Sequence, residues 1–169
     1  YSYGETGNDN TGSQWLYISE FTNYKPFTTG SPGLSMNNLT VREGKVPNVN
    51  AQWERAKKHD LGLDLTLFKN SVSFTGEVYS ETRDGILMTR RAVATWFGQS
   101  LASLNIGSTK RHGFELEAGY NNSVGSLHYW IKGNYNFNEN RVINQDDPAE
   151  TPEYQKNAGK PIGYFASAL

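Results

Sequence analysis

The sequence predicts an all-β fold, specifically a segment of an antiparallel transmembrane β-barrel. Three observations predict it: long segments in which apolar and polar residues alternate, a composition rich in aromatic residues and glycine, and connections that are short and long in turn. Aromatic residues make up 13% of the chain, and 17 of its 169 residues are glycine. This mixture is typical of strands joined by tight turns and polar loops.

The clearest alternation runs over residues 60–68, where a leucine occupies every odd position from Leu61 to Leu67. Polar or small residues occupy the even positions from Asp60 to Thr66, so the segment has two chemically different faces. A polar turn at residues 69–71 follows, and alternation resumes over residues 72–82. We therefore predict an antiparallel hairpin.

The second half of the chain predicts another pair of strands. The period is lost over residues 89–109, and apolar residues return at alternate positions from Phe114 to Tyr120. After a turn at residues 121–126, the longest predicted strand covers residues 126–138, and one more strand begins at residues 161–165. Strand parity predicts a lipid-facing set and a lumen-facing set. The lipid-facing residues are Leu61, Leu63, Leu65, Phe114, Leu116 and Ile131, and the lumen-facing ones are Asp64, Glu115, Glu117 and Lys132.

The connections alternate in length along the chain. They are long at residues 6–50, 89–109 and 139–160, and short at the two turns between them. Outer-membrane barrels have short turns on one rim and long loops on the other. We therefore expect both short turns at one end of the sheet, and the loops that carry Trp96 and Asp146 at the opposite end. Closed barrels of this kind need about eight strands or more, so four whole strands predict part of a larger barrel.

Composition excludes several classes of function. The 16 basic and 17 acidic residues leave a net charge of −1, which gives no basic surface for a nucleic acid. The absence of cysteine excludes a disulfide scaffold, a cysteine-ligated zinc site and thiol catalysis. No stretch approaches the roughly 18 apolar residues of a membrane-spanning helix.

Two carboxylates raise the question of catalysis. Glu115 and Glu117 are two residues apart on one predicted strand face, a separation of about 7 Å that falls within the range of inverting glycosidases. Neighbours on one face of any strand share this spacing, so we expect a polar lumen wall, paired with residues such as Lys132, rather than an enzyme. A glycan hydrolase using the two glutamates remains an alternative.

No metal or cofactor site is predicted. The three histidines, at positions 59, 112 and 128, lack the spacing of metal ligands. Asp146 and Asp147 are followed at once by Pro148, which predicts a solvated turn rather than a calcium loop.

Four aromatic residues lie in the long predicted loops, where exposed rings are natural platforms for sugar rings or peptide side chains. These candidate ligand-binding residues are Trp15, Tyr17, Trp96 and Phe97. The alternatives are packing within the loops themselves, or contact with a partner protein.

Four short motifs are distributed along the chain. The segment SYGETGN stands at residues 2–8, NVNAQWE at 48–54 with GLD at 62–64, KRHGFELE at 110–117 and GKPIG at 159–163. In their order and spacing these motifs resemble those of SusC/RagA-type TonB-dependent outer-membrane transporters. The sequence departs from the family pattern at Val49, where proline is usual, and at Arg111 and His112, which replace an Asn-Lys pair.

The resemblance implies a fold, a location and partners. Residues 1–169 would belong to the wall of a plugged barrel of about 22 strands, without the plug and the TonB-contacting segment. The protein would lie in lipid of the bacterial outer membrane and import an oligosaccharide or a peptide. A SusD-like surface lipoprotein and the TonB complex would be its partners. The alternative from another class is a soluble β-sandwich carbohydrate-binding module, which would stay monodisperse without detergent.

Overall fold

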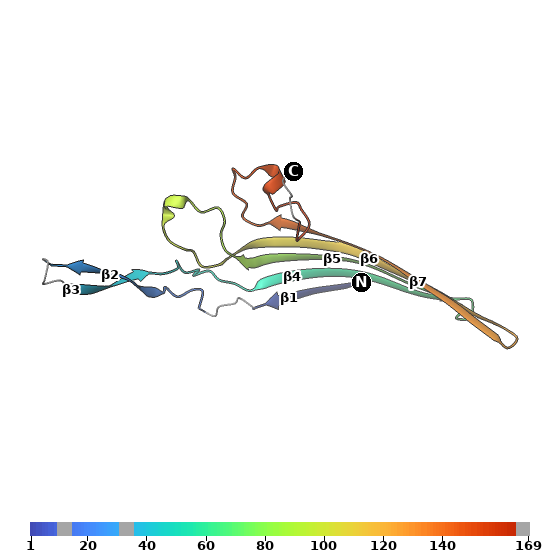
Figure 1. Cartoon of the computed structure of the whole chain (residues 1–169). Coiled ribbons are helices and arrows are strands. Elements are labelled where there is room, and N and C mark those ends of the chain that lie inside the picture. Colours follow the sequence, from blue (N-terminus) through green and yellow to red (C-terminus); the bar gives the residue numbers. More distant parts are fainter. Residues whose placement is uncertain (10–14, 31–35, 165–169) are drawn as a thin grey trace.

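The computed structural model describes residues 1–9, 15–30 and 36–164 (Figure 1). Five antiparallel strands form one long sheet in the order β1-β4-β5-β6-β7. These strands are β1 (Ser2–Asn8), β4 (Glu54–Leu67), β5 (Val72–Met88), β6 (Leu104–Val124) and β7 (Leu127–Asn144). Two further strands, β2 (Phe21–Thr29) and β3 (Met36–Glu43), pair only with each other, and the short 3-10 helices are η1 (Thr95–Phe97) and η2 (Glu153–Gln155).

The large sheet is an open wall. The strands β4 to β7 contain 14, 17, 21 and 18 residues, more than the roughly 9–11 that a tilted strand needs to cross a bilayer. β1 and β7 are its two edges and do not pair with each other. Among the described residues, no helix is long and apolar enough to cross a membrane. The predicted all-β barrel segment is confirmed.

The two predicted rims are confirmed. The turns after β4 and β6 lie together at one end of the sheet, which we call the turn end, and the backbone N–H of Asn121 donates to the carbonyl of Ser71 there across 2.8 Å. The connections at residues 89–103 and 145–163 lie at the other end, which we call the loop end (Figure 1). Asn70 and Trp96 are therefore at opposite ends.

Strand register separates the predicted residue sets onto opposite faces. Leu61 pairs with Val78 and Val78 with Phe114, whereas Asp64 pairs with Thr75 and Thr75 with Glu117. Opposite residues in a ladder share a face, so one face, the apolar face, carries the leucines and the other, the polar face, carries the carboxylates. Ile131, opposite Tyr120, lies on the apolar face, and Lys132, opposite Gly119, on the polar face.

Neither face is covered by a second layer of the described chain. No large side chain among the described residues is fully buried, and Leu61 and Ile131 remain 57% and 69% exposed. The sheet therefore lacks the packed core of a β-sandwich, in which two inner faces cover each other.

A glycine lies against an aromatic side chain in the middle of the sheet. Gly113 on β6 lies opposite Tyr79 on β5, and a Cβ atom at position 113 would lie only 2.7 Å from the Tyr79 hydroxyl oxygen. The guanidinium of Arg111 lies over the same ring, 5.4 Å from its centroid. Only glycine leaves room for this arrangement.

Several predicted boundaries are wrong. The predicted loop at residues 89–109 ends at residue 103, because β6 begins at Leu104 and pairs there with Met88. The predicted turn at residues 121–126 shrinks to Gly125 and Ser126, with Gly125 at a φ of 62°. In both places the backbone pairing with a neighbouring strand extends beyond the residues in which apolar and polar side chains alternate.

Two predictions at the ends of the chain also differ. The long connection predicted over residues 6–50 contains the β2–β3 hairpin, whose Thr-rich and Asn-rich strands show little alternation. The strand predicted at residues 161–165 does not form over 161–164, where Tyr164 N–H donates to the Pro161 carbonyl in a turn, and Phe165 lies outside the described residues.

Candidate functional site

The polar face holds the two candidate carboxylates within a wider set of acidic side chains. Glu115 lies opposite Glu77 on β5 and Asn136 on β7, and Glu117 lies opposite Asn134. The carboxylate of Glu117 pairs with the ammonium of Lys132 across 2.7 Å. The sequence-based expectation that Lys132 pairs with a glutamate is therefore confirmed.

The histidines lie in three separate local contacts. The ring of His59 shares a hydrogen bond of 2.8 Å with the Tyr1 hydroxyl, and the ring of His128 one of 2.6 Å with the Ser123 hydroxyl. His112 Nε2 lies 3.6 Å from Glu139. Within the described ranges, no three His, Cys, Asp or Glu residues are grouped as metal ligands.

Asn48 joins three segments at the loop end. Its backbone N–H donates to the Leu16 carbonyl across 2.7 Å, and its side-chain amide donates to the Ser103 carbonyl across 2.9 Å. Its side-chain oxygen accepts from the Asn50 N–H, and the residue is only 6% exposed. The segment that carries Trp15 is thus linked to the end of the loop that carries Trp96.

A pair of aspartates connects the loop at residues 89–103 to the loop at residues 145–163. Asp146 accepts from the backbone N–H groups of Arg91 and Ala92 across 2.8 and 3.0 Å. Asp147 accepts from the N–H groups of Asn157 and Ala158 across 2.8 and 2.9 Å. The predicted solvated turn is therefore wrong, because both carboxylates accept hydrogen bonds from backbone N–H groups at least ten residues away in the sequence.

Asp147 is the more enclosed of the two aspartates. Its side chain is 6% exposed, and Arg91 Nη1 lies 3.2 Å from its Oδ1. Burial favours the neutral acid, but the N–H groups of Ala158 and Asn157, together with Arg91, outweigh it and hold the pKa of Asp147 below its usual value. The residue is therefore a charged connection between the loops at 89–103 and 145–163.

The segment after β7 lies along the free edge of that strand at the loop end, because the backbone N–H of Val142 donates to the Lys160 carbonyl across 2.9 Å and the Gly159 N–H donates to the Val142 carbonyl across 2.7 Å. Ile162 N–H donates to the side-chain oxygen of Asn140 across 2.7 Å. Asn140 lies opposite Arg111, which has the parity of Glu115, so it belongs to the polar face. The loop with Trp96 is linked, through the aspartate pair, to this segment beside β7, which binds one side chain of the polar face.

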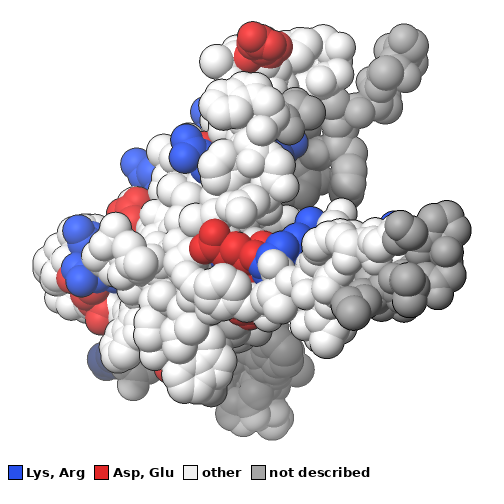
Figure 2. All heavy atoms as spheres, turned by 90° about the vertical axis from the view of Figure 1, so that its left-hand side faces the viewer, with Lys and Arg blue, Asp and Glu red and all other residues white. Residues whose placement is uncertain are grey.

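The four predicted ligand-binding aromatics all lie at the loop end and are exposed. Trp15 and Tyr17 form a ring pair with centroids 6.2 Å apart. Trp96 lies on η1 and is 87% exposed, and Phe97 beside it is 40% exposed. Seen from this end, the described surface is mostly uncharged, with acidic and basic side chains side by side in small groups (Figure 2). Such a surface suits contact with rings and amides better than capture of a strong ion.

Sequence reasoning missed Asn48, the aspartate pair as a connection and the β2–β3 hairpin. Asn48 stands in the quoted NVNAQWE motif, so the motif was the available signal. No local pattern predicts the aspartate connection, because the donors to Asp146 and Asp147 come from residues about ten to fifty-five positions away. The β2–β3 hairpin was missed because its strands show little apolar alternation.

A family model described as "TonB dependent receptor-like, beta-barrel" matches residues 2–168. The chain belongs to this family. The TonB-dependent receptor family consists of outer-membrane β-barrel proteins that are not enzymes, so the chain is a segment of outer-membrane barrel wall. Its apolar face is the lipid face, its polar face is the lumenal face, and its loop end is the extracellular rim, since long loops lie outside the cell.

Curated relatives and solved structures agree with this assignment. TonB-dependent receptor P3 of Formosa agariphila is 26% identical over 147 residues, covering 86% of this chain and 14% of the relative. TonB-dependent receptor P39 of the same organism is 25% identical over 166 residues, covering 96% and 15%. The RagAB peptide importer in its open-open state has the same fold, with a TM-score of 0.65 at 19% identity, over 85% of this chain and 15% of that one.

The chain thus spans about 15% of the length of these relatives. The comparisons favour a SusC-like receptor segment over the β-sandwich module.

Proposed function

We propose that this receptor segment serves TonB-dependent import of an oligosaccharide or a peptide across the outer membrane. The observation that supports this most is the separation of the two faces over the same registers of β4 to β7, with apolar residues toward lipid and charged residues toward the lumen. A wall of this kind encloses a polar path through a bilayer. The RagAB structure, a peptide importer with the same fold, supports the peptide half of the proposal.

The charge of the lumenal face limits the chemical class of cargo that we propose. Five carboxylates and one ammonium occupy four successive rows of this face, namely Asp60, Asp64, Glu77, Glu115, Glu117 and Lys132. Rings and rows of carboxylates disfavour anions through Coulomb repulsion. We therefore propose a neutral or cationic cargo rather than an acidic polysaccharide.

The extracellular rim provides the proposed capture surface. Trp96 and Phe97 stand on a loop that is connected through Arg91 and Asp147 to the segment beside β7. We propose that these two rings, with Trp15 and Tyr17, contact the cargo before it passes inward.

The β2–β3 hairpin offers a surface for the proposed SusD-like lipoprotein. Phe21, Leu39 and Val41 lie on one face of this hairpin and are 71%, 86% and 61% exposed. The hairpin projects beyond the end of the large sheet (Figure 1). An isolated two-stranded hairpin is marginally stable in water, so an apolar stripe on it favours a protein partner.

Uptake by cells that carry the full-length receptor tests the proposal. Fluorescent neutral maltooligosaccharides, a fluorescent acidic pectin oligomer and a labelled tryptic digest of albumin serve as three probes. We expect internal label from a neutral or peptide probe only when TonB is functional. Label that enters equally without TonB, or only from the acidic probe, would contradict the proposal.

A further inference from the structure

The lipid face changes character abruptly toward the extracellular rim. Four successive cross-strand rows on β4 to β7 hold only apolar or small residues, from the row of Leu67, Val72, Tyr120 and Ile131 to the row of Leu61, Val78, Phe114 and Phe137. The next row contains His59, Ser80, His112 and Glu139, and the one after it Lys57, Thr82, Lys110 and Arg141. Rows on one face are about 7 Å apart, so cations begin within about 14 Å of the last apolar row.

Two of these cations form no ion pair within the part of the chain that the structure describes. Arg141 is paired, since its Nε lies 2.6 Å from Glu139. Lys57 and Lys110 are exposed and make no ion pair with any described residue. Glu5 on β1 stands opposite Lys57 in the ladder, without a bond between the side chains. The row therefore keeps an excess of positive charge directed outward, away from the lumen.

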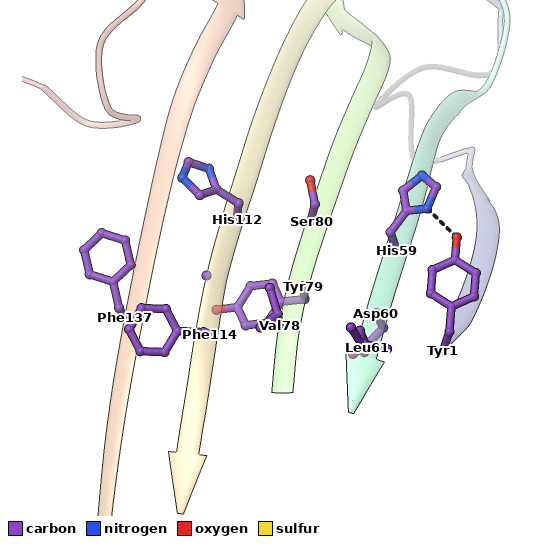
Figure 3. Close-up of a pocket in the computed structure, with 11 residues that line it drawn as sticks. Tyr1, His59, Asp60, Leu61, Val78, Tyr79, Ser80, His112, Phe114 and Phe137 are labelled. Atoms are coloured by element: carbon purple, nitrogen blue, oxygen red, sulfur yellow. Dashed lines mark hydrogen bonds between the residues drawn. The ribbon is translucent and has the colours of Figure 1, made fainter. Parts of the chain in front are cut away.

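A shallow cavity of about 370 Å³ lies between the apolar rows and this cationic row. Its apolar lining includes Leu61, Val78, Phe114 and Phe137, and His59 and His112 stand at its outer side (Figure 3). Ser80 lies between the two histidines, and its small side chain leaves the space open (Figure 3). The cavity thus has an apolar floor toward the bilayer centre and polar groups toward the rim.

We propose that the outer side of this wall holds a phosphate-bearing lipid of the outer leaflet, with its headgroup phosphate at Lys57 and Lys110 and an acyl chain in the cavity. Charge complementarity supports this occupant, because lysine ammonium groups bind phosphate as point charges. Both lysines lie on the lipid face, so ligands in the lumen do not reach them. Arg141, held by Glu139, borders the site. The site is separate from the path of the cargo and is independent of what the receptor imports.

Ordinary snorkelling of lysines toward water is the simpler reading of such a row. Snorkelling predicts no preference among lipids, whereas a phosphate site predicts one. The two readings therefore differ in a quantity that is measured directly, namely which lipid stays bound to the purified receptor.

The experiment uses the full-length receptor in neutral detergent micelles that contain equal amounts of phosphatidylcholine and phosphatidic acid. Native mass spectrometry counts the lipids that the receptor retains. The test variant is Lys57→Gln with Lys110→Gln. The matched control is Lys58→Gln with Arg111→Gln, which removes the same charge from the neighbouring positions on the lumenal face of the same strands.

We expect the wild-type receptor and the control to retain phosphatidic acid in preference to phosphatidylcholine, and the test variant to lose this preference by about fivefold or more. Equal retention of phosphatidic acid by the test variant and the wild type would overturn the site, as would equal losses in the test variant and the control. Displacement of phosphatidic acid by millimolar inorganic phosphate would also overturn it, since the site would then be one for a free anion.

Discussion

Arg91 and Asp147 form an ion pair across the extracellular rim, with Nη1 and Oδ1 3.2 Å apart. They belong to two different loops, one between β5 and β6 and the other after β7. The pair has a structural consequence because Asp147 also accepts from the N–H groups of Asn157 and Ala158. One enclosed carboxylate thus connects the loop that carries Trp96 to the segment that lies beside β7.

Substitution Asp147→Asn should loosen this rim. An amide loses the charge that attracts Arg91 and weakens two backbone hydrogen bonds, and hydrogen bonds to a charged group contribute about 1.5–3 kcal/mol each. Exchange of the Asn157 and Ala158 amide hydrogens should accelerate about tenfold to a hundredfold, as measured by hydrogen exchange and mass spectrometry. Glu150→Gln, which changes an exposed carboxylate in the same loop, is the control and should leave exchange unchanged.

The same carboxylate predicts a dependence on pH. The pKa of Asp147 is lower in the folded protein than its usual value of about 3.9, so its stabilisation is present above that value and is lost as pH falls through the lower folded pKa. Opening of the rim should therefore increase below about pH 4 in the wild type and show less pH dependence in Asp147→Asn. Identical pH profiles for the two proteins would remove Asp147 from this role.

Substitution Trp96→Ala tests the proposed capture surface. A ring that stacks on a ligand commonly contributes about 1.4 kcal/mol or more, so the affinity of the full-length receptor for its imported probe should fall about tenfold or more. Trp130→Ala is the control, because Trp130 is also exposed, at 78%, but lies near the turn end. Titration calorimetry measures both. An unchanged affinity in Trp96→Ala would remove this residue from the site.

Particular residues show how far the sequence predicts this structure. The leucines at positions 61 to 67 predict β4 and its facing correctly, because parity depends only on the chain itself. The start of β6 at Leu104 is missed, since pairing with Met88 there is decided by a neighbouring strand and not by local alternation. The contacts of Asn48 and Asp147 are missed for the same reason, because their partners are distant in sequence.

The facing of the sheet gives a prediction about lipid contact. Leu65 lies on the lipid face, and a lysine there should cost about 2–4 kcal/mol of unfolding free energy if it lies near the bilayer midplane. Thr66→Lys is the control, because Thr66 is the next residue in the chain and lies on the lumenal face. It should change the free energy of unfolding by about 0.5 kcal/mol or less. Urea unfolding of the full-length receptor in phospholipid vesicles measures both. A cost for Leu65→Lys within that smaller range would mean that this position faces water.

The last prediction concerns Glu115 and Glu117. Glu117 pairs with Lys132, with 46% and 57% of the two side chains exposed, and an ion pair this exposed contributes about 0–1 kcal/mol. The double substitution Glu115→Gln with Glu117→Gln should therefore leave the receptor folded, and it should leave the chemical bonds of the imported probe intact, as the wild type does. Mass spectrometry of the probe after incubation with each purified receptor measures this. Removing two charges from the lumenal wall should weaken its preference for cationic over anionic probes, because fewer carboxylates then repel an anion. Cleavage of the probe by the wild type that disappears in the double variant would instead show that the two carboxylates do chemistry.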